Sequence, residues 1–209
     1  MKLLAIDTCT QVCSVSLRVE NQQTNRLVEG VEKSSSLILP LCAEVLAEAK
    51  ITPAELDGII YTQGPGSFTG VRMCVAVAQG VALGQNIPTI GFSTLKLLGF
   101  AAEKKYHTKK VAVALDARMG QVYWGIYQEQ TLLDESLKNP AEVPKLSSDF
   151  IGVGSGWGAY RQALCQQTGI TNLQPDFYPK AQDLIDLYLL KTEQKLDNQL
   201  ALPTYLRNN

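Results

Sequence analysis

The distribution of apolar and polar residues along the chain predicts a fold in which strands and helices alternate. Short, mostly apolar runs typical of buried strands are separated by longer segments with apolar residues at helical spacing. The first run ends on a carboxylate, Asp7. In the first half we expect strands at 2–7, 13–19, 26–29, 58–61 and 89–92, helices at 37–50, 71–83 and 93–104, and a short helix beginning at Pro53.

The same order of elements begins again after residue 110. A predicted strand at 111–116 also ends on a carboxylate, Asp116, and a strand returns at 122–127. A strand and glycine loop at 149–156 then lead into a helix at 159–168, as 57–70 leads into its own helix. This repetition predicts the duplication of one α/β unit.

The duplication suggests two lobes, residues 1–103 and residues 104–209. The basic, apolar-poor run 104–110 is interpreted as a solvated linker between them, and it contains the single histidine, His107, for which we expect a surface role. We predict irregular structure at 129–148. The chain closes with a helix at 181–195 and a tail, both free to pack back on the first lobe.

The most distinctive stretch is Gly64-Pro65-Gly66-Ser67-Phe68-Thr69-Gly70-Val71-Arg72, which joins a predicted strand to the helix at 71–83. Its glycines and proline predict a tight turn. Ser67 and Thr69 are placed to cap the helix, whose N-terminal N–H groups attract anions. The Gly-Lys-Ser/Thr ending of a P-loop is absent, however, and the glycine spacing is one residue too long for the dinucleotide fingerprint. An anion cradle and a turn that packs the helix on the sheet both stay open.

The helix predicted at 71–83 is apolar around most of its circumference and should be almost entirely buried. Two stripes of small residues run along it, Cys74-Ala78-Ala82 and Ala76-Gly80-Gly84, and they would let another helix approach closely. Either the helix at 37–50 or a helix of another subunit would satisfy this pattern. In the second case we expect a partner interface at Leu37, Leu41, Val45, Cys74, Ala76, Val77, Gly80, Val81 and Gly84.

Charge and cysteine content exclude several classes of protein. A formal net charge of −1 and a pI near 5.9 argue against a protein that grips nucleic acid alone, so any role on RNA needs a partner. The five cysteines are odd in number and form no Cys-x-x-Cys pair, which indicates buried free thiols in a reducing compartment rather than a zinc site. No apolar run approaches the length of a membrane span, and we expect a cytoplasmic protein without membrane contact.

Asp7 and Asp116 are the paired carboxylates that a cleft for magnesium and a nucleotide would require. Each could instead cap its own turn, which is the better interpretation of either residue taken singly. A serine or cysteine nucleophile needs a nearby base, and the single histidine is badly placed for that role. We therefore expect no catalytic residue, no metal site, and at most a vestigial nucleotide cleft at Asp7, Thr8 and Asp116.

Four segments together resemble the bacterial TsaB (YeaZ) family over essentially the whole chain. They are the opening Ile6-Asp7-Thr8 with Ser14-Val15-Ser16-Leu17, the run from Gly64 to Arg72, the hairpin Leu115-Asp116-Ala117-Arg118, and the ending Pro203-Thr204-Tyr205-Leu206-Arg207. The Gly-Pro-Gly-Ser-Phe-Thr-Gly run is highly specific, and the other segments support it by their order and spacing. Many relatives carry a histidine just before the first long helix, where this chain has Ser34.

The resemblance implies an actin-like (ASKHA) duplicated two-lobed α/β fold and a role in making threonylcarbamoyladenosine beside the anticodon of tRNA. It implies a non-catalytic partner of a TsaD-like catalytic subunit, working with a TsaE-like ATPase and reaching tRNA only through that complex. Alone, the chain would form a homodimer that a pseudo-symmetric contact with the TsaD-like subunit displaces. No tightly bound cofactor is expected, with ATP or ADP only in the assembled complex. The alternatives are a glycoprotease-like peptidase and a stand-alone small-molecule kinase or ATPase.

Overall fold

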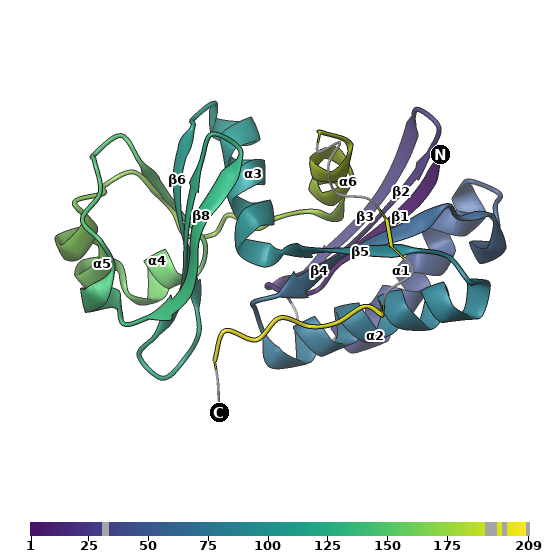
Figure 1. Cartoon of the computed structure of the whole chain (residues 1–209), viewed down its shortest axis with the longest axis horizontal. Helices are drawn as coiled ribbons and strands as arrows, with labels where there is room; N and C mark the ends of the chain where they lie inside the picture. Colours follow the sequence, from purple (N-terminus) through teal and green to yellow (C-terminus); the bar gives the residue numbers. More distant parts are fainter. Residues whose placement is uncertain (31–33, 191–195, 198–199, 208–209) are drawn as a thin grey trace. The chain divides into compact units, whose positions relative to one another are not determined.

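The structure, a computed structural model, describes residues 1–30, 34–190, 196–197 and 200–207 (Figure 1). Contacts divide the chain into two compact units. The first unit consists of Met1–Ser93 and Lys180–Thr204, and the second of Thr94–Pro179 and Tyr205–Asn209.

The first unit is built on a five-stranded sheet in the order β3-β2-β1-β4-β5. β1, β2 and β3 form an antiparallel meander, and β4 and β5 extend the sheet parallel to β1. Because β1 and β4 are parallel neighbours, Asp7 at the end of β1 lies near the loop that follows β4. The strands are β1 (Lys2–Asp7), β2 (Val12–Val19), β3 (Gln22–Glu29), β4 (Gly58–Gly64) and β5 (Thr89–Ser93).

The second unit repeats this sheet in the order β10-β9-β6-β7-β8. β6, β7 and β8 are antiparallel, while β9 is parallel to β6 and β10 is parallel to β9. Order and direction therefore match the first sheet strand for strand, which confirms the predicted duplication and the actin-like α/β class. The strands are β6 (Lys110–Asp116), β7 (Val122–Gln128), β8 (Thr131–Lys138), β9 (Ile151–Val153) and β10 (Leu173–Gln174).

Helices cover both faces of the first sheet. α1 (Ser34–Glu48) and α2 (Phe68–Gln85) pack on one face and on each other, whereas α6 (Ala181–Leu190) packs on β1, β2 and β4 at the opposite face (Figure 1). The Ser14 side chain of β2 accepts a hydrogen bond from the first backbone N–H of α6, at 2.9 Å. Residues 191–195, which we predicted to continue α6, lie outside the described residues.

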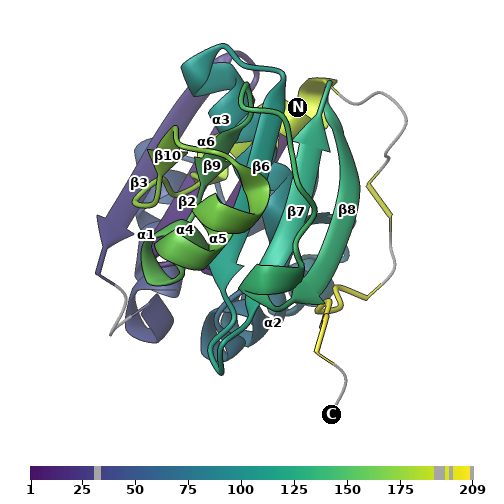
Figure 2. The same ribbon diagram turned by 90° about the vertical axis from the view of Figure 1, so that its left-hand side faces the viewer.

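In the second unit α3 (Thr94–Tyr106) packs on β6, β7 and β8, while α4 (Gly156–Ala159) packs on β6 and β9 (Figure 2). α5 (Arg161–Thr168) follows α4 directly. Trp157 of α4 is fully buried, and its indole N–H donates to the carbonyl of Ala112 at 3.0 Å. α3 and α6 each follow the fifth strand of one repeat and pack on the sheet of the other.

This exchange of helices changes the division of the chain. We predicted a boundary between residues 103 and 104, but the two units divide at Ser93 and Thr94, because α3 buries its apolar face on the second sheet. Residues 180–204 belong to the first unit.

The prediction for one segment was wrong. Residues 129–148 contain β8 and a short 3-10 helix, η3 (Pro140–Glu142), where we expected irregular structure. β8 lies at the edge of its sheet and, among the described strands, pairs with β7 alone, across a register shift at Ile126 and Tyr127. Only part of its surface is buried, so its apolar pattern is weak.

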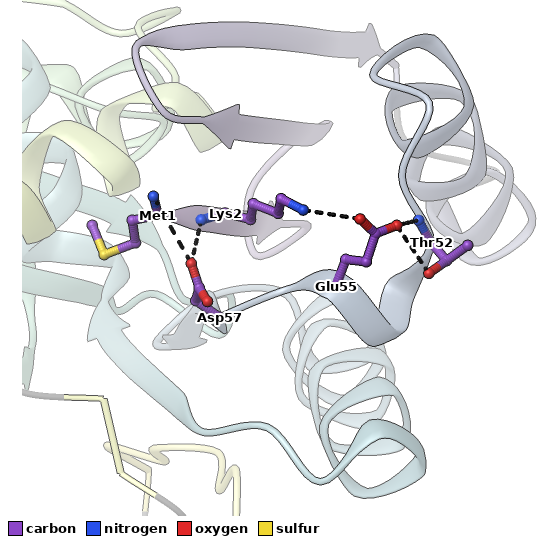
Figure 3. Close-up of polar contacts among 5 residues, drawn as sticks. All are labelled: Met1, Lys2, Thr52, Glu55 and Asp57. Atoms are coloured by element: carbon purple, nitrogen blue, oxygen red, sulfur yellow. Dashed lines mark hydrogen bonds and ion pairs between the residues drawn. The ribbon is translucent and has the colours of Figure 1, made fainter.

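A group of polar contacts fixes the start of β1 to the 3-10 helix η2 (Pro53–Glu55) and the residues after it (Figure 3). The backbone N–H of Lys2 donates to the Asp57 carboxylate at 2.6 Å, and the Lys2 ammonium lies 2.9 Å from a Glu55 carboxylate oxygen. Glu55 also accepts from the backbone N–H of Thr52 at 2.8 Å. These exposed contacts tie the start of β1 to the segment that precedes β4.

Among the described residues, no helix is both long enough and apolar enough to cross a membrane.

Candidate functional site

In the first unit the glycine loop packs against the turn that follows Asp7. The backbone N–H of Ser67 donates to the carbonyl of Cys9 at 2.9 Å, and the hydroxyl of Thr8 donates to the carbonyl of Gly70 at 2.7 Å. Ser67 is the N-cap of α2, and its hydroxyl accepts from the N–H of Gly70 at 3.1 Å. Thr69, also proposed as a cap, is an exposed residue in the first turn of α2.

The glycines of this loop are required by close backbone approach. A Cβ on Gly66 would overlap the carbonyl of Cys9, and a Cβ on Gly70 would overlap the carbonyl of Thr8. Gly64 has φ of +102°, which only glycine adopts easily, and its position also faces the carbonyl of Thr204. These close approaches and the hydrogen bonds of Ser67 and Gly70 favour the packing turn over the anion cradle.

Asp7, at the end of β1, is fully buried. Its Oδ1 accepts from the hydroxyl of Thr62 at 2.6 Å and from the backbone N–H of Cys9 at 3.0 Å. Its Oδ2 is buried and has no hydrogen-bond partner among the described residues. Removal from water raises the pKa of Asp7 to about 6, against the opposing effect of the two hydrogen bonds.

This raised pKa predicts that the ionised Asp7 destabilises the fold. Its contribution is fully favourable below the unfolded pKa of 3.8 and is lost as the pH rises through about 6. Asp7→Asn cannot ionise and keeps the Oδ1 acceptor. Between pH 5 and pH 8 we expect the free energy of unfolding of the variant, relative to the wild type, to rise by about 1.5 kcal/mol. Urea denaturation of both proteins at the two pH values measures this, and a difference that does not change with pH would contradict it.

The thiols around Asp7 are unsuited to nucleophilic chemistry. Cys9, Cys13 and Cys42 are buried, and desolvation raises the pKa of the Cys9 thiol well above its usual value and those of Cys13 and Cys42 to about 12. Cys74 donates a hydrogen bond to the carbonyl of Ile6 at 3.3 Å. His107 is exposed in the turn between α3 and β6.

In the second unit Asp116 organises its own turn. Oδ1 accepts from the backbone N–H of Arg118 at 2.8 Å and from the hydroxyl of Tyr160 at 3.1 Å, and Oδ2 lies 3.0 Å from the Arg118 guanidinium. The backbone N–H of Asp116 donates to the hydroxyl of Ser155 at 3.1 Å. These contacts favour the interpretation of Asp116 as a residue that caps its turn.

The contacts of Ser155 and Tyr160 with Asp116 were not predicted from the sequence. The repeat could have indicated Ser155, which follows β9 as the loop with Ser67 follows β4, but it gives no signal for Tyr160. Among the described residues, no group of three or more His, Cys, Asp or Glu side chains could hold a metal ion.

The predicted partner helices divide into a buried and an exposed side. Leu41, Val45, Cys74 and Val77 are buried in the core between α1, α2 and the first sheet, and Leu37 and Val81 are half-buried beside it. The stripe Cys74-Ala78-Ala82 therefore packs within the chain. We had expected α2 to be buried around its whole circumference, and this prediction was wrong.

The second stripe of α2 is exposed. Ala76, Gly80 and Gly84 face outward, and nothing lies within 4 Å of a Cβ placed on Gly80 or Gly84. Phe68, 61% exposed, and Leu83, 65% exposed, flank this stripe. We call these five residues the α2 stripe, and they form a surface with little side-chain bulk at its centre. At its N-terminal end the guanidinium of the exposed Arg72 lies 3.6 Å from the centre of the Phe68 ring.

Comparison with known proteins supplies a family for these features. The family model described as TsaD, tRNA N6-adenosine threonylcarbamoyltransferase, matches residues 19–174. The chain is 33% identical over 225 residues to the tRNA threonylcarbamoyladenosine biosynthesis protein TsaB of Escherichia coli, an alignment that covers all of this chain and 96% of that protein.

Two solved structures from Pseudomonas aeruginosa share the fold at 33% identity. One, described as an uncharacterised protein with similarity to peptidase YeaZ, has a TM-score of 0.88 and covers 99% of both chains. The other, YeaZ, has a TM-score of 0.87 and covers 98% of this chain and 99% of its own.

Proposed function

Because this chain belongs to the TsaB (YeaZ) family of tRNA threonylcarbamoyladenosine biosynthesis proteins, we propose that it serves that pathway as a non-catalytic subunit. It binds a TsaD-like catalytic subunit, works with a TsaE-like ATPase, and reaches tRNA only through the complex. The site of action is the cytoplasm, where tRNA is modified. The observation that carries this proposal is the exposed α2 stripe.

The α2 stripe has the properties of a helix-docking surface. Small residues at its centre permit close approach of a second helix, and Leu83 at its margin, 65% exposed, gains by being covered. The chain alone would cover this surface with a second copy, and a TsaD-like subunit of similar fold would displace that copy.

The polar groups of the two strand ends support a non-catalytic role. Thr8 and the glycine loop bond to each other, and Asp116 bonds to its own turn and to Tyr160. Asp7 is fully buried, so it is poorly placed to hold a hydrated magnesium ion. We propose that the isolated chain holds no nucleotide tightly, and that ATP or ADP binds only in the assembled complex.

The two alternative functions have less support. A peptidase requires a nucleophile with a base beside it, but the pKa of Cys9, Cys13 and Cys42 is raised and the one histidine lies in an exposed turn. A stand-alone kinase requires an open phosphate-binding turn after Asp7, where the glycine loop now packs.

Reconstitution tests the proposal. With tRNA, ATP, threonine and bicarbonate, and the enzyme that makes the threonylcarbamoyl donor, this chain alone should yield no modified nucleoside by mass spectrometry. Addition of the TsaD-like and TsaE-like subunits should give turnover that is lost when this chain is omitted. Asp7→Ala and Asp116→Ala should stay within a few-fold of the wild-type rate once complex formation is saturated.

Three results would contradict the proposal. Turnover that does not depend on this chain would remove its role, and a large loss of rate in a folded Asp variant that still assembles would show that it contributes chemistry. Calorimetry that finds a micromolar or tighter ATP site on the isolated chain would favour the kinase.

A further inference from the structure

The hairpin turn between β6 and β7 presents a methionine at its tip. Met119 is 83% exposed, more than any other large apolar side chain among the described residues. Arg118, Met119 and Gly120 have φ of 61°, 55° and 75°, so three successive residues adopt the left-handed conformation. The backbone N–H of Ala117 donates to the carbonyl of Gln121 at 3.0 Å and closes the turn. The turn therefore holds the side chain of Met119 in solvent.

The C-terminal tail places a guanidinium on this turn. Nη2 of Arg207 donates to the carbonyl of Ala117 at 3.1 Å and to the side-chain oxygen of Gln121 at 2.8 Å. Its Nη1 donates to the sulfur of Met119 at 3.3 Å. A thioether sulfur is a weak acceptor, so this third contact contributes least. All three of these acceptors are uncharged, and a stronger acceptor at the position of the sulfur would therefore hold the tail more firmly.

The other two methionines of the chain are less accessible. Met73 lies in α2 and is half-buried against the core of the first unit, and Met1 is 48% exposed. A peroxide must reach the sulfur to oxidise it, so Met119 should react first. Methionine oxidation disrupts a protein where it introduces a polar group into a core. Met119 lies outside the core, and the added oxygen has room there.

We propose that Met119 is an oxidation site whose sulfoxide fastens the tail to the turn. Hydrogen peroxide transfers one oxygen atom to the sulfur: the O–O bond breaks, an S–O bond forms, the sulfur loses two electrons and the peroxide leaves as water. The new oxygen is bonded to the atom that Arg207 already contacts, and it is a much better acceptor than a thioether. It receives a charge-assisted hydrogen bond from Nη1, so the tail of an oxidised chain is held more firmly than that of a reduced one.

Trypsin measures how firmly the tail is held. Cleavage after Arg207 requires its side chain to leave the turn and enter the pocket of the protease. Cleavage after Lys145, which is exposed elsewhere in the second unit, serves as the internal reference. The full chain is treated with hydrogen peroxide and digested under native conditions, and mass spectrometry gives the initial rate at each site and locates the sulfoxide.

The expected results concern both the site of oxidation and its effect. We expect Met119 to be oxidised at least about fivefold faster than Met73. Cleavage after Arg207, relative to cleavage after Lys145, should then slow about fivefold, because a hydrogen bond from a charged donor to a good acceptor replaces a weak one.

Variants at the two less similar methionines complete the test. Met119→Leu keeps an apolar side chain that peroxide does not oxidise, so peroxide should leave its cleavage after Arg207 unchanged. Met119→Gln supplies a permanent amide oxygen and should be cleaved slowly before any peroxide is added. Met73→Leu keeps the oxidation site and should respond to peroxide as the wild type does.

Each other outcome counts against the proposal. Faster or unchanged cleavage after Arg207 in the oxidised wild type would overturn it, as would oxidation of Met73 before Met119. A response to peroxide that persists in Met119→Leu would assign the effect to another residue. Methionine sulfoxide reductases restore the thioether and should return the cleavage rate to its initial value. A rate that stays low after this reduction would show other oxidative damage and overturn the proposal as well.

Discussion

Replacing Gly70 by alanine is expected to lower the free energy of unfolding by about 3–5 kcal/mol, because the new methyl group overlaps the backbone of Thr8. A backbone carbonyl cannot rotate away as a side chain can. The loop must therefore move, and it loses the hydrogen bonds from Thr8 to Gly70 and from Ser67 to Cys9. For a chain of this size the midpoint of thermal unfolding should fall by about 10 °C.

The same substitution at Gly80 is the matched control. Gly80 lies in the same helix, and nothing lies within 4 Å of the Cβ that alanine would add. Gly80→Ala should raise the stability of the isolated chain by about 0.5–1 kcal/mol, since alanine has the higher helix propensity. Similar melting temperatures for the two variants would show that the loop does not pack on the Thr8 turn as described.

Replacing Gly80 by arginine should abolish association while the chain stays folded. The side chain has open space in the single chain, but it would hold a docked helix away and bury a charge without a counterion. We expect a monomer by sedimentation velocity, and affinity for the TsaD-like subunit at least about a hundredfold weaker, which corresponds to about 2.7 kcal/mol. The melting curve of a monomeric sample should show an intact fold.

Ala141→Arg is the control for this experiment. Ala141 is exposed in η3 of the second unit, so the same charge is added away from the α2 stripe, and association should be unchanged. A Gly80→Arg variant that still forms the dimer and still binds the TsaD-like subunit would place the interface elsewhere.

The strands that end on Asp7 and Asp116 were predicted correctly because short apolar runs with a polar end have few other interpretations. Their repetition also predicted the duplication. β8 could not be predicted, since an edge strand with one partly buried face resembles a loop until its neighbour β7 is known.

The site was less predictable than the fold. The glycines at 66 and 70 indicated a close approach, but the partner in that approach, the Thr8–Cys9 turn, was not apparent because Thr8 is 62 residues from Gly70 in sequence. The pattern of apolar residues likewise predicted that α2 is buried on all sides. It could not show that Cys74 faces the chain's own core whereas Gly80 faces outward.

The discontinuous first unit has a consequence for biosynthesis. Its sheet is covered by α6, and its glycine loop lies beside the tail, where the N–H of Thr204 donates to the carbonyl of Gln63 at 2.7 Å and the N–H of Leu202 donates to the hydroxyl of Tyr61 at 3.1 Å. Residues 94–179 leave the ribosome before either segment. The second unit can therefore complete its core first. Until α6 and the tail are translated, which takes roughly 5–20 seconds, one apolar face of the N-terminal sheet stays exposed. Aggregation or chaperone capture of the nascent chain should concentrate in that interval.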